Sequence, residues 1–340
     1  MAEPLLEVRD LKVHFDTMDG VVKAVDGVSF SVERGQTLGV VGESGSGKSV
    51  TFLTIMGLTS LKAAHVEGEV LYRGRNLLEL SQSEMRKIRG DEIGMIFQDP
   101  MTSLHPMYKV GDQIAEAIRA HRDVSKGEAR SSAVDLLKRV GIPLPEERAR
   151  QYPHEYSGGM RQRAMIAMAL SLDPDLLIAD EPTTALDVTV QAQIMELIEQ
   201  MKNELNIGVV LITHDLGVVA DVSQNVMVMY AGRAIELGTK EKVFQQPLHP
   251  YAWGLLESIP AVDRRVDRLI PIEGSPPSLI HVPPGCPFHP RCPHSFEPCD
   301  KDRPELVDRG GGHPDACHLS IEEKKRLWAQ REEQRTATPA

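Results

Sequence analysis

The chain has 340 residues, which exceeds the commonest single-domain size and allows a substantial hydrophobic core. Its 49 acidic residues outnumber its 38 basic residues, and the resulting net charge of -11 argues against broad attraction to nucleic acid or anionic lipid. No apolar run reaches the roughly 20 residues that span a bilayer, and the N-terminus lacks the positive region of a secretory signal. We therefore expect a cytoplasmic protein that reaches a membrane only through a partner.

The first part of the chain changes from a strand pattern to a helix pattern. Residues 5–41 form short apolar runs separated by turn residues, which predicts antiparallel strands that lead into one buried strand. Between residues 110 and 142 apolar residues recur at helical spacing, and Gly141 and Pro143 end that pattern. A β-rich start followed by a helical segment is expected.

Two later apolar runs predict a parallel sheet. The runs DLLIAD at 175–180 and GVVLIT at 208–213 are short and unbroken, which is typical of strands buried on both faces. Between them, apolar residues mark one face of a predicted crossover helix: Val190, Ile194, Leu197 and Met201. The expected fold class is α/β, built from βαβ units with a helical insertion.

The composition changes after about residue 245. Nine prolines between Pro271 and Pro298 are too many for regular helices or strands. We expect one domain over residues 1–245 and a loop-rich extension over residues 246–340. The charged tail from Ser320 is predicted to form at most one helix, followed by disorder.

A glycine-rich loop follows the first predicted buried strand. The stretch GESGSGKS matches the pattern G-x-x-x-x-G-K-[ST] at Gly42, Gly47, Lys48 and Ser49. Glycines let backbone N–H groups point at phosphate oxygens, and the helix that follows adds the positive end of its dipole. Lys48 would neutralise the β- and γ-phosphates, and the Ser49 hydroxyl would bind Mg²⁺. The pattern predicts a nucleoside triphosphate site.

Two carboxylates end the predicted strand at 175–180. Asp180 could hold the shell of a magnesium ion, and Glu181, the next residue, could act as general base toward an attacking water. The alternative is a strand end that carries two solvated side chains. Together with the glycine-rich loop, the pair favours nucleotide hydrolysis.

Several motifs, taken in order, resemble those of the ATP-binding cassette (ABC) family over residues 5–245. YSGGMRQR is similar to the family signature, although Tyr156 stands where a leucine is usual and Met160 where a glutamine is usual. MIFQDP resembles the Q-loop, TALD the D-loop and LITHD the switch-histidine strand. The resemblance implies an ABC-type P-loop NTPase with a RecA-like core, an antiparallel β subdomain and a helical subdomain at about 99–169.

The resemblance also assigns a role to each matching residue. It implies catalysis by Glu181, Gln98 and His214, with Mg²⁺ bound by Ser49 and Gln98. Residues implied to contact ATP are Phe15 (against adenine), Gly42, Ser44, Gly45, Gly47, Lys48, Ser49, Val50, Gln98, Asp180, Ser157, Gly158, Gly159 and Asp187. Without the resemblance, Phe15 and His214 would be interpreted as structural residues.

A narrower resemblance concerns the kind of transporter. FQDPMTSLHP, YPHEYSGGMRQR and HPYAWGLLESIP followed by GCPFHPRC resemble the ATPase subunits of dipeptide and oligopeptide permeases. This implies an ATP-driven translocase subunit at the cytoplasmic face of the cell membrane. Its implied partners are a second, similar ATPase, two transmembrane permease subunits and an extracytoplasmic peptide-binding protein, with no nucleic acid. Related importers carry nickel or other small solutes, which is the alternative cargo.

Two other classes of function were weighed against transport. A soluble ABC protein of repair or translation would carry a long coiled-coil insertion or a second cassette, and the sequence contains neither. A redox or metal sensor would use the cysteines as its main output. The complete set of ATPase motifs favours the transport ATPase.

All four cysteines lie in the extension, at Cys286, Cys292, Cys299 and Cys317. In a reducing compartment they suit a ligand set better than two disulfides, and both zinc and an iron-sulfur cluster accept four thiolates. Free buried thiols are a further alternative. Five nearby histidines are additional zinc donors: His281, His289, His294, His313 and His318. The resemblance to peptide-permease extensions implies a [4Fe-4S] cluster. Because metal bonds could hold a proline-rich segment in one shape, we predict a structural or partner-docking role. Loss of the metal should leave nucleotide affinity largely intact.

Overall fold

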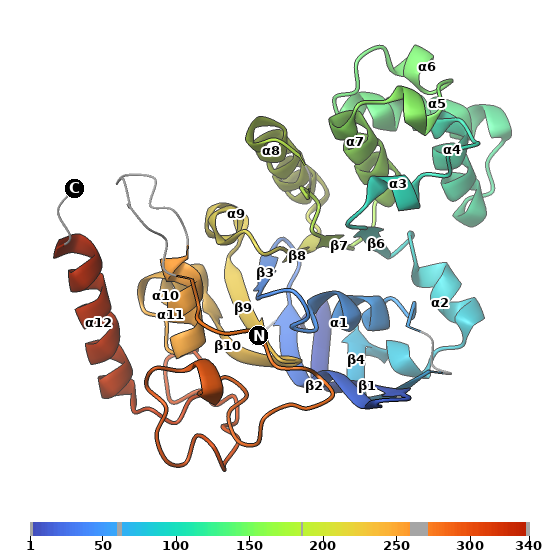
Figure 1. Cartoon of the computed structure of the whole chain (residues 1–340). Helices are drawn as coiled ribbons and strands as arrows, with labels where there is room; N and C mark the ends of the chain where they lie inside the picture. The colour runs from blue at the N-terminus through green and yellow to red at the C-terminus, as the bar shows by residue number, and fades with distance from the viewer. Residues whose placement is uncertain (1–2, 60–62, 185, 259–270, 338–340) are drawn as a thin grey trace. The chain divides into compact units, whose positions relative to one another are not determined.

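The computed structural model describes residues 3–59, 63–184, 186–258 and 271–337, and it divides into two compact units. Residues 7–30, 38–70 and 213–340 form one of them, which we call the P-loop unit. Residues 1–6, 31–37 and 71–212 form the other, which we call the helical unit. Figure 1 labels the helices and strands of both.

The P-loop unit contains two groups of strands. A two-residue turn joins β1 (Leu6–Thr17) to β2 (Gly20–Val32), so these neighbours run antiparallel, and β4 (Ala64–Tyr72) lies on the other side of β1. In the second group, β9 (Asn225–Tyr230) lies between the antiparallel β10 (Arg233–Thr239) and the parallel β3 (Thr37–Val41). Every residue of β3 is buried. The predicted antiparallel start and the buried strand are confirmed.

Five helices belong to the P-loop unit within the described ranges: α1 (Lys48–Ile55), α9 (Leu216–Val222), α10 (Lys240–Gln245), α11 (Pro250–Glu257) and α12 (Ile321–Ala337). Residues 271–320, by contrast, contain one short 3-10 turn, η3 (His289–Arg291), and isolated bridges. This confirms the loop-rich segment that the prolines predict, because proline cannot donate to a backbone ladder.

The charged tail forms one helix, α12, as the sequence predicts, and this helix is docked on the rest of the unit. Trp328 is 5% exposed and its Nε1 donates to the carbonyl oxygen of Gln245 at 3.1 Å. Its ring lies 6.3 Å from the fully buried ring of Trp253 on α11. The burial of two indoles anchors the helix, which continues to Ala337. Residues 338–340, where we predicted disorder, lie outside the described residues.

The helical unit contains three parallel strands. β7 (Leu176–Asp180) lies between β6 (Ile93–Ile96) and β8 (Gly208–Ile212). The helix between β7 and β8, α8 (Val188–Leu205), buries Ile194, Leu197 and Met201, while Val190 is half-buried. The predicted crossover helix and the βαβ arrangement are therefore confirmed, and so is the α/β fold class.

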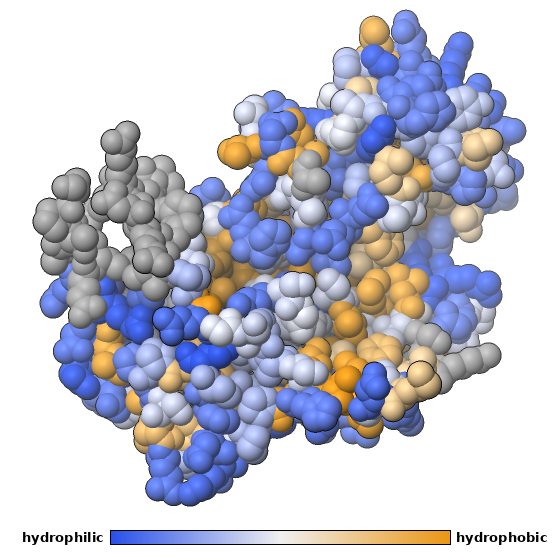
Figure 2. All heavy atoms as spheres, viewed as in Figure 1, coloured by the Kyte–Doolittle hydropathy of each residue, from blue (hydrophilic) through white to orange (hydrophobic). Residues whose placement is uncertain are grey.

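The other elements of the helical unit are short. They are β5 (Arg75–Asn76), η1 (Leu77–Glu79), α2 (Gln82–Ile88), α3 (Pro100–Ser103), α4 (Val110–His121), α5 (Lys126–Arg139), α6 (Pro145–Arg148), η2 (Pro153–Glu155) and α7 (Gly158–Ala169). Helices α4, α5 and α7 pack against one another. The face of this group seen in Figure 2 is mainly hydrophilic.

Two separate helices fill the segment in which the sequence predicts helical structure. Ser125 caps the start of α5 by accepting from the backbone N–H of Glu128, while the Glu128 carboxylate accepts from the backbone N–H of Ser125. This capping box ends the continuity with α4 and fixes the entry of the chain into α5. Gly141, with a φ of +74°, follows the helix and stops it as predicted.

A fully buried ion pair joins α12 to the loop before it. Lys324 Nζ lies 2.5 Å from Asp315 Oδ2, and neither side chain has exposed surface. Arg309, which is partly exposed, donates to the other Asp315 oxygen at 2.7 Å. Loss of Lys324 would leave the buried Asp315 carboxylate with only the partly exposed Arg309 as its cation, which destabilises the fold.

We expect Lys324→Met to lower the free energy of unfolding by about 3 kcal/mol, because Asp315 loses its buried cation. The double variant Lys324→Met/Asp315→Asn should recover part of this loss, because no carboxylate charge stays buried. Arg326→Met, which removes an exposed cation of the same helix, should change stability by no more than about 0.5 kcal/mol. Denaturant unfolding measures all three, and a double variant no more stable than Lys324→Met would contradict this account.

Candidate ATP site and cysteine cavity

The glycine-rich loop connects β3 to α1 in the P-loop unit. Gly42 and Gly47 have φ angles of +154° and +99°. A Cβ atom would lie 2.2 Å from the carbonyl oxygen of Met229 at Gly42, and 2.3 Å from that of Ala24 at Gly47. Both the backbone angle and the space therefore require glycine at these positions. The predicted strand, loop and helix are present in the expected order.

The side chain of Lys48 folds against this loop. Its Nζ donates to the carbonyl oxygens of Gly42 at 2.6 Å and Glu43 at 3.0 Å, and the residue is 6% exposed. Among the other predicted phosphate contacts, Ser44 and Gly45 are exposed, while Ser49 and Val50 are half-buried at the start of α1. An ammonium group and a helix N-terminus thus meet at one loop, which suits a polyphosphate.

Two more predicted residues lie in the same unit. Phe15 is half-buried in β1, and His214 is exposed directly before Asp215, the N-cap of α9. Their predicted roles, against adenine and the γ-phosphate, stay predictions because both depend on a bound nucleotide.

The helical unit brings the predicted base and the Q-loop glutamine together. Asp180, the last residue of β7, is 6% exposed, and Glu181 follows it with a φ of +46°. Gln98 Nε2 donates to Glu181 Oε2 at 2.8 Å across 83 residues of sequence. The Glu181 N–H donates to the carbonyl oxygen of Ile212 at 2.8 Å, which fixes the backbone of Glu181 beside the end of β8. Two of the predicted catalytic side chains are thus in contact.

Thr184 belongs to the same cluster, although sequence reasoning did not select it. Its Oγ1 donates to Glu181 Oε2 at 2.8 Å, the oxygen that also accepts from Gln98. Two donors on one carboxylate oxygen limit the rotation of the Glu181 side chain. The only sequence signal was a hydroxyl three residues after the predicted base in DEPTTALD.

The predicted signature residues begin α7. Ser157 is the N-cap and its Oγ accepts from the backbone N–H of Met160 at 3.3 Å. Ser157 and Gly158 are exposed, and Gly159 is half-buried, where an added Cβ would meet Val190 at 3.0 Å. The predicted D-loop residue Asp187 caps α8 by accepting from the N–H of Val190 at 3.0 Å. The two motifs of the helical unit are therefore helix starts.

Tyr156, the departure from the family signature, is part of the local packing. It is 3% exposed, and its hydroxyl donates to the carbonyl oxygen of Arg148 at 2.9 Å. Burial raises the pKa of this hydroxyl to about 12. The tyrosine therefore replaces an apolar side chain without leaving a buried polar atom unsatisfied.

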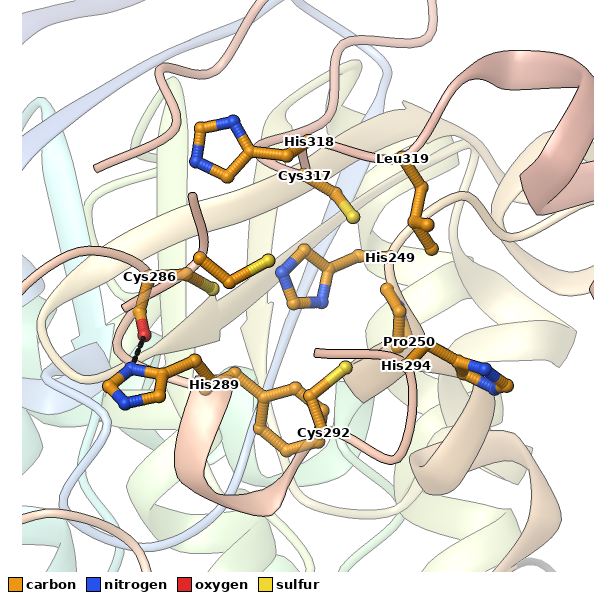
Figure 3. A pocket seen from close by; sticks show the side chains of 11 residues that line it. His249, Pro250, Cys286, His289, Cys292, His294, Cys317, His318 and Leu319 are labelled. Atoms are coloured by element: carbon orange, nitrogen blue, oxygen red, sulfur yellow. Dashed lines mark hydrogen bonds between the residues drawn. The ribbon is translucent and has the colours of Figure 1, made fainter. Parts of the chain in front are cut away.

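The four cysteines of the P-loop unit line one small cavity (Figure 3). All four thiols are free, and Cys286, Cys299 and Cys317 are buried while Cys292 is half-buried. Figure 3 shows the sulfur atoms of Cys292 and Cys317 directed toward the middle of the cavity. The four cysteines, which the sequence predicts as one set of metal ligands, thus come from residues 286–317 to one cavity.

Burial sets the protonation of three of the thiols. It raises the pKa of Cys292 to about 11 and that of Cys317 to about 12, and it also raises the pKa of Cys286. These thiols are therefore protonated at neutral pH. A metal bound here would have to displace the protons, so its affinity would increase with pH.

Histidines at the cavity differ from those expected. His289, His294 and His318 line it, together with His249, which sequence reasoning missed. His281 and His313 are not among its lining residues; His313 instead contacts Glu236 at 2.8 Å. His249 is 1% exposed, and its Nε2 has no hydrogen-bond partner among the described residues. An unsatisfied polar atom at a cavity of thiols is consistent with a polar group bound there.

The metal itself is not confirmed. The described residues contain no group of three or more His, Cys, Asp or Glu side chains arranged to hold a metal ion. In the part of the chain that the structure describes, therefore, the thiols share a cavity without forming a ready ligand set for a single ion such as zinc.

Two family models match this chain, one over the region of the glycine-rich loop and one over part of the extension. Residues 25–184 match the family model of ABC transporters, and residues 235–299 match that of the C-terminal region of oligopeptide/dipeptide transporters. A solved dimeric structure of a bacterial ABC transporter cassette has a TM-score of 0.62 at 29% identity, and the similarity covers 69% of this chain and 98% of that one.

Curated relatives extend the similarity to nearly the whole chain. The dipeptide transport ATP-binding protein DppD of Bacillus subtilis is 52% identical over 318 residues, 93% of this chain and 95% of the relative. The oligopeptide transport ATP-binding protein OppD of Escherichia coli is 50% identical over 322 residues, 95% of each chain. The ABC transporter model and these relatives together show that the chain is an ATPase. It belongs to the family of ATP-binding subunits of dipeptide and oligopeptide ABC transporters.

Proposed function

We propose that this chain is the ATP-hydrolysing subunit of an importer for dipeptides or oligopeptides, and that Glu181 is its general base. The observation that carries the catalytic assignment is the Glu181 carboxylate, whose Oε2 accepts from both Gln98 and Thr184 at 2.8 Å. A base held by two donors keeps one direction, which general-base catalysis requires of the group that takes a proton from water.

The phosphates would be bound by the glycine-rich loop. Lys48 exchanges its contacts with the carbonyl oxygens of Gly42 and Glu43 for contacts with phosphate oxygens, and the N-terminus of α1 adds its dipole. Ser49 and Gln98 are the residues that would hold Mg²⁺, which neutralises charge on the transferred phosphate when bound. Phe15 would contact adenine, and His214 and Asp180 would complete the site.

Two such subunits would act together. Ser157 and Gly158 are exposed at the start of the 12-residue helix α7, which offers N–H groups and a helix dipole to an anion outside the subunit. The related cassette solved as a dimer supports this arrangement. We infer pairing with a second, similar ATPase, so that ATP binding closes the pair and hydrolysis releases it.

The relatives support the proposed cargo and location. DppD and OppD are named for dipeptide and oligopeptide transport, and they match this chain from the cassette through the extension. The described residues contain no helix long and apolar enough to cross a membrane. From the relatives, we propose that the chain lies at the inner face of the cell membrane, bound to two permease subunits that receive peptide from an external binding protein.

We further propose that the cysteine cavity binds a [4Fe-4S] cluster through Cys286, Cys292, Cys299 and Cys317, with zinc as the alternative. The support is the gathering of four thiols in one cavity and the unsatisfied Nε2 of buried His249 beside them. Four thiolates are the usual ligand set of such a cluster, and a hydrogen bond to its sulfur is a known means of tuning it.

Replacement of Glu181 by glutamine should abolish turnover while ATP still binds. We expect kcat to fall by at least about 100-fold in Glu181→Gln, because the amide cannot accept the proton. Phosphate release measures hydrolysis, and gel filtration with ATP should show trapped closed dimers. Near-normal hydrolysis would reject Glu181 as the base. Thr184→Val, which removes one donor but keeps the carboxylate, should lower kcat by only about tenfold.

Metal analysis of anaerobically purified protein tests the cavity. We expect four irons and labile sulfide per chain. Cys292→Ser should lose them, whereas His281→Gln, outside the cavity lining, should keep them. Loading should improve from pH 6 to pH 8, because buried thiols must lose protons to bind metal. One zinc per chain without sulfide would reject the cluster, and no metal would reject the site.

Transport by the assembled importer tests the cargo. Vesicles that contain the ATPase pair, the permease subunits and the binding protein should take up labelled dipeptide or tetrapeptide only when ATP is present. Unlabelled peptide should compete for uptake, and nickel should not. ATP-dependent nickel uptake without peptide uptake would overturn the peptide assignment while leaving the ATPase assignment intact.

A further inference from the structure

Arg291, in the segment between Cys286 and Cys292, reaches the glycine-rich loop. Its Nη1 and Nη2 donate to the two carboxylate oxygens of Glu43 at 2.7 and 3.0 Å, across 248 residues of sequence. Glu43 is the second residue of GESGSGKS, directly after Gly42. The side chains are 5% and 27% exposed, so this two-pronged ion pair is largely shielded from water.

The Arg291 guanidinium is held in place from several directions. Its Nε donates to the carbonyl oxygen of Glu273 at 2.9 Å, and Nη2 donates to those of Ile272 and Gly274 at 3.3 Å. Nη1 also donates to the Tyr230 hydroxyl at 3.3 Å. With its direction set by these acceptors, Arg291 presents a fixed fork to Glu43, which a flexible lysine could not do.

A second contact from the extension fixes the backbone of the same residue. The N–H of Glu43 donates to the hydroxyl of Tyr251, a fully buried side chain of α11, at 2.8 Å. The carbonyl oxygen of Glu43 in turn accepts from Lys48 Nζ at 3.0 Å. The extension therefore fixes both the side chain and the backbone N–H of Glu43. The carbonyl oxygen of the same residue accepts from Lys48, the predicted phosphate-binding lysine.

We propose that Arg291 is a positioning residue for ATP, which fixes the phosphate loop through Glu43 and makes the cysteine-bearing segment part of the nucleotide site. Without Arg291, the Glu43 carboxylate would lose its partner close to where the phosphates bind, and the loop would lose an anchor. Both effects weaken binding of an anion more than they affect the chemical step. The sequence analysis expects loss of the cysteine-bound metal to leave nucleotide affinity largely intact, whereas this proposal predicts that Arg291 in the same segment influences it.

The extension provides a matched control for this pair. Arg303 donates to the carboxylate of Asp26 on β2 at 2.6 Å, so it also joins the extension to a strand of the cassette. Asp26 lies outside the glycine-rich loop. Arg303→Met therefore removes an ion pair that also joins the extension to the cassette, although a single-bonded and more exposed one, without changing a contact of Glu43.

The test is a double-mutant cycle on the full-length chain, with Arg291→Met, Glu43→Gln and both together. A fluorescent ATP analogue reports affinity, and steady-state hydrolysis separates KM from kcat. We expect Arg291→Met to raise Kd and KM for ATP by about tenfold with kcat within about threefold. Glu43→Gln should raise them less, because it loses the anchor but leaves no unpaired carboxylate, and the double variant should be no worse than Arg291→Met. Arg291→Lys should lie between Arg291→Met and the unchanged chain, because it keeps the charge but loses the fork.

Arg303→Met should lower the melting temperature while KM stays within about twofold of the unchanged chain. Equal increases of KM in Arg303→Met and Arg291→Met would assign Arg291 a merely structural role and overturn the proposal. An unchanged KM in Arg291→Met would also overturn it, as would additive effects of Arg291→Met and Glu43→Gln, since independent residues do not act through one contact.

Discussion

The nucleotide site depends on backbone segments packed too closely for any side chain to fit. The Cα of Gly42 lies against the carbonyl oxygen of Met229, and that of Gly47 against the carbonyl oxygen of Ala24. Strands β9 and β2, which belong to different sheets, therefore both contact the loop and set its position. Because phosphate binding needs donors placed within fractions of an ångström, packing of the P-loop unit is itself a requirement for catalysis.

The extension adds to this constraint. Tyr251 and Arg291 reach the loop at Glu43, one residue from Gly42, and the buried aromatic rings of Tyr230 and Tyr251 lie 4.6 Å apart beside them. Tyr230 belongs to β9, the strand whose residue Met229 contacts Gly42. One strand thus contacts the glycine-rich loop and the extension together. The segment after residue 245 thus contacts the residue next to Gly42 through two side chains, Tyr251 and Arg291.

The sequence could predict the parts of this site that local spacing encodes. Gly42 and Gly47 predict the loop, because its backbone angles require glycine. Unbroken apolar runs predict buried strands, because both faces of such strands are buried. Contacts such as Arg291 with Glu43, or Lys324 with Asp315, join polar residues with no periodic pattern. Thr184 and His249 were missed for the same reason, because a single hydroxyl or imidazole predicts no role until the residues that surround it in the fold are known.

The proline-rich segment shows how loops can be fixed without a backbone ladder. Glu236, fully buried on β10, accepts from the N–H groups of Leu248 and His249 and contacts His313, each at 2.8 Å. Asp315, which is also fully buried, forms ion pairs with the side chains of Lys324 and Arg309. Two buried carboxylates therefore join the loops to β10 and α12, so a metal is not needed to explain the path of these loops. The polar atom that the described residues leave without a partner at the cysteine cavity is Nε2 of buried His249, and the proposed cluster would bind beside it.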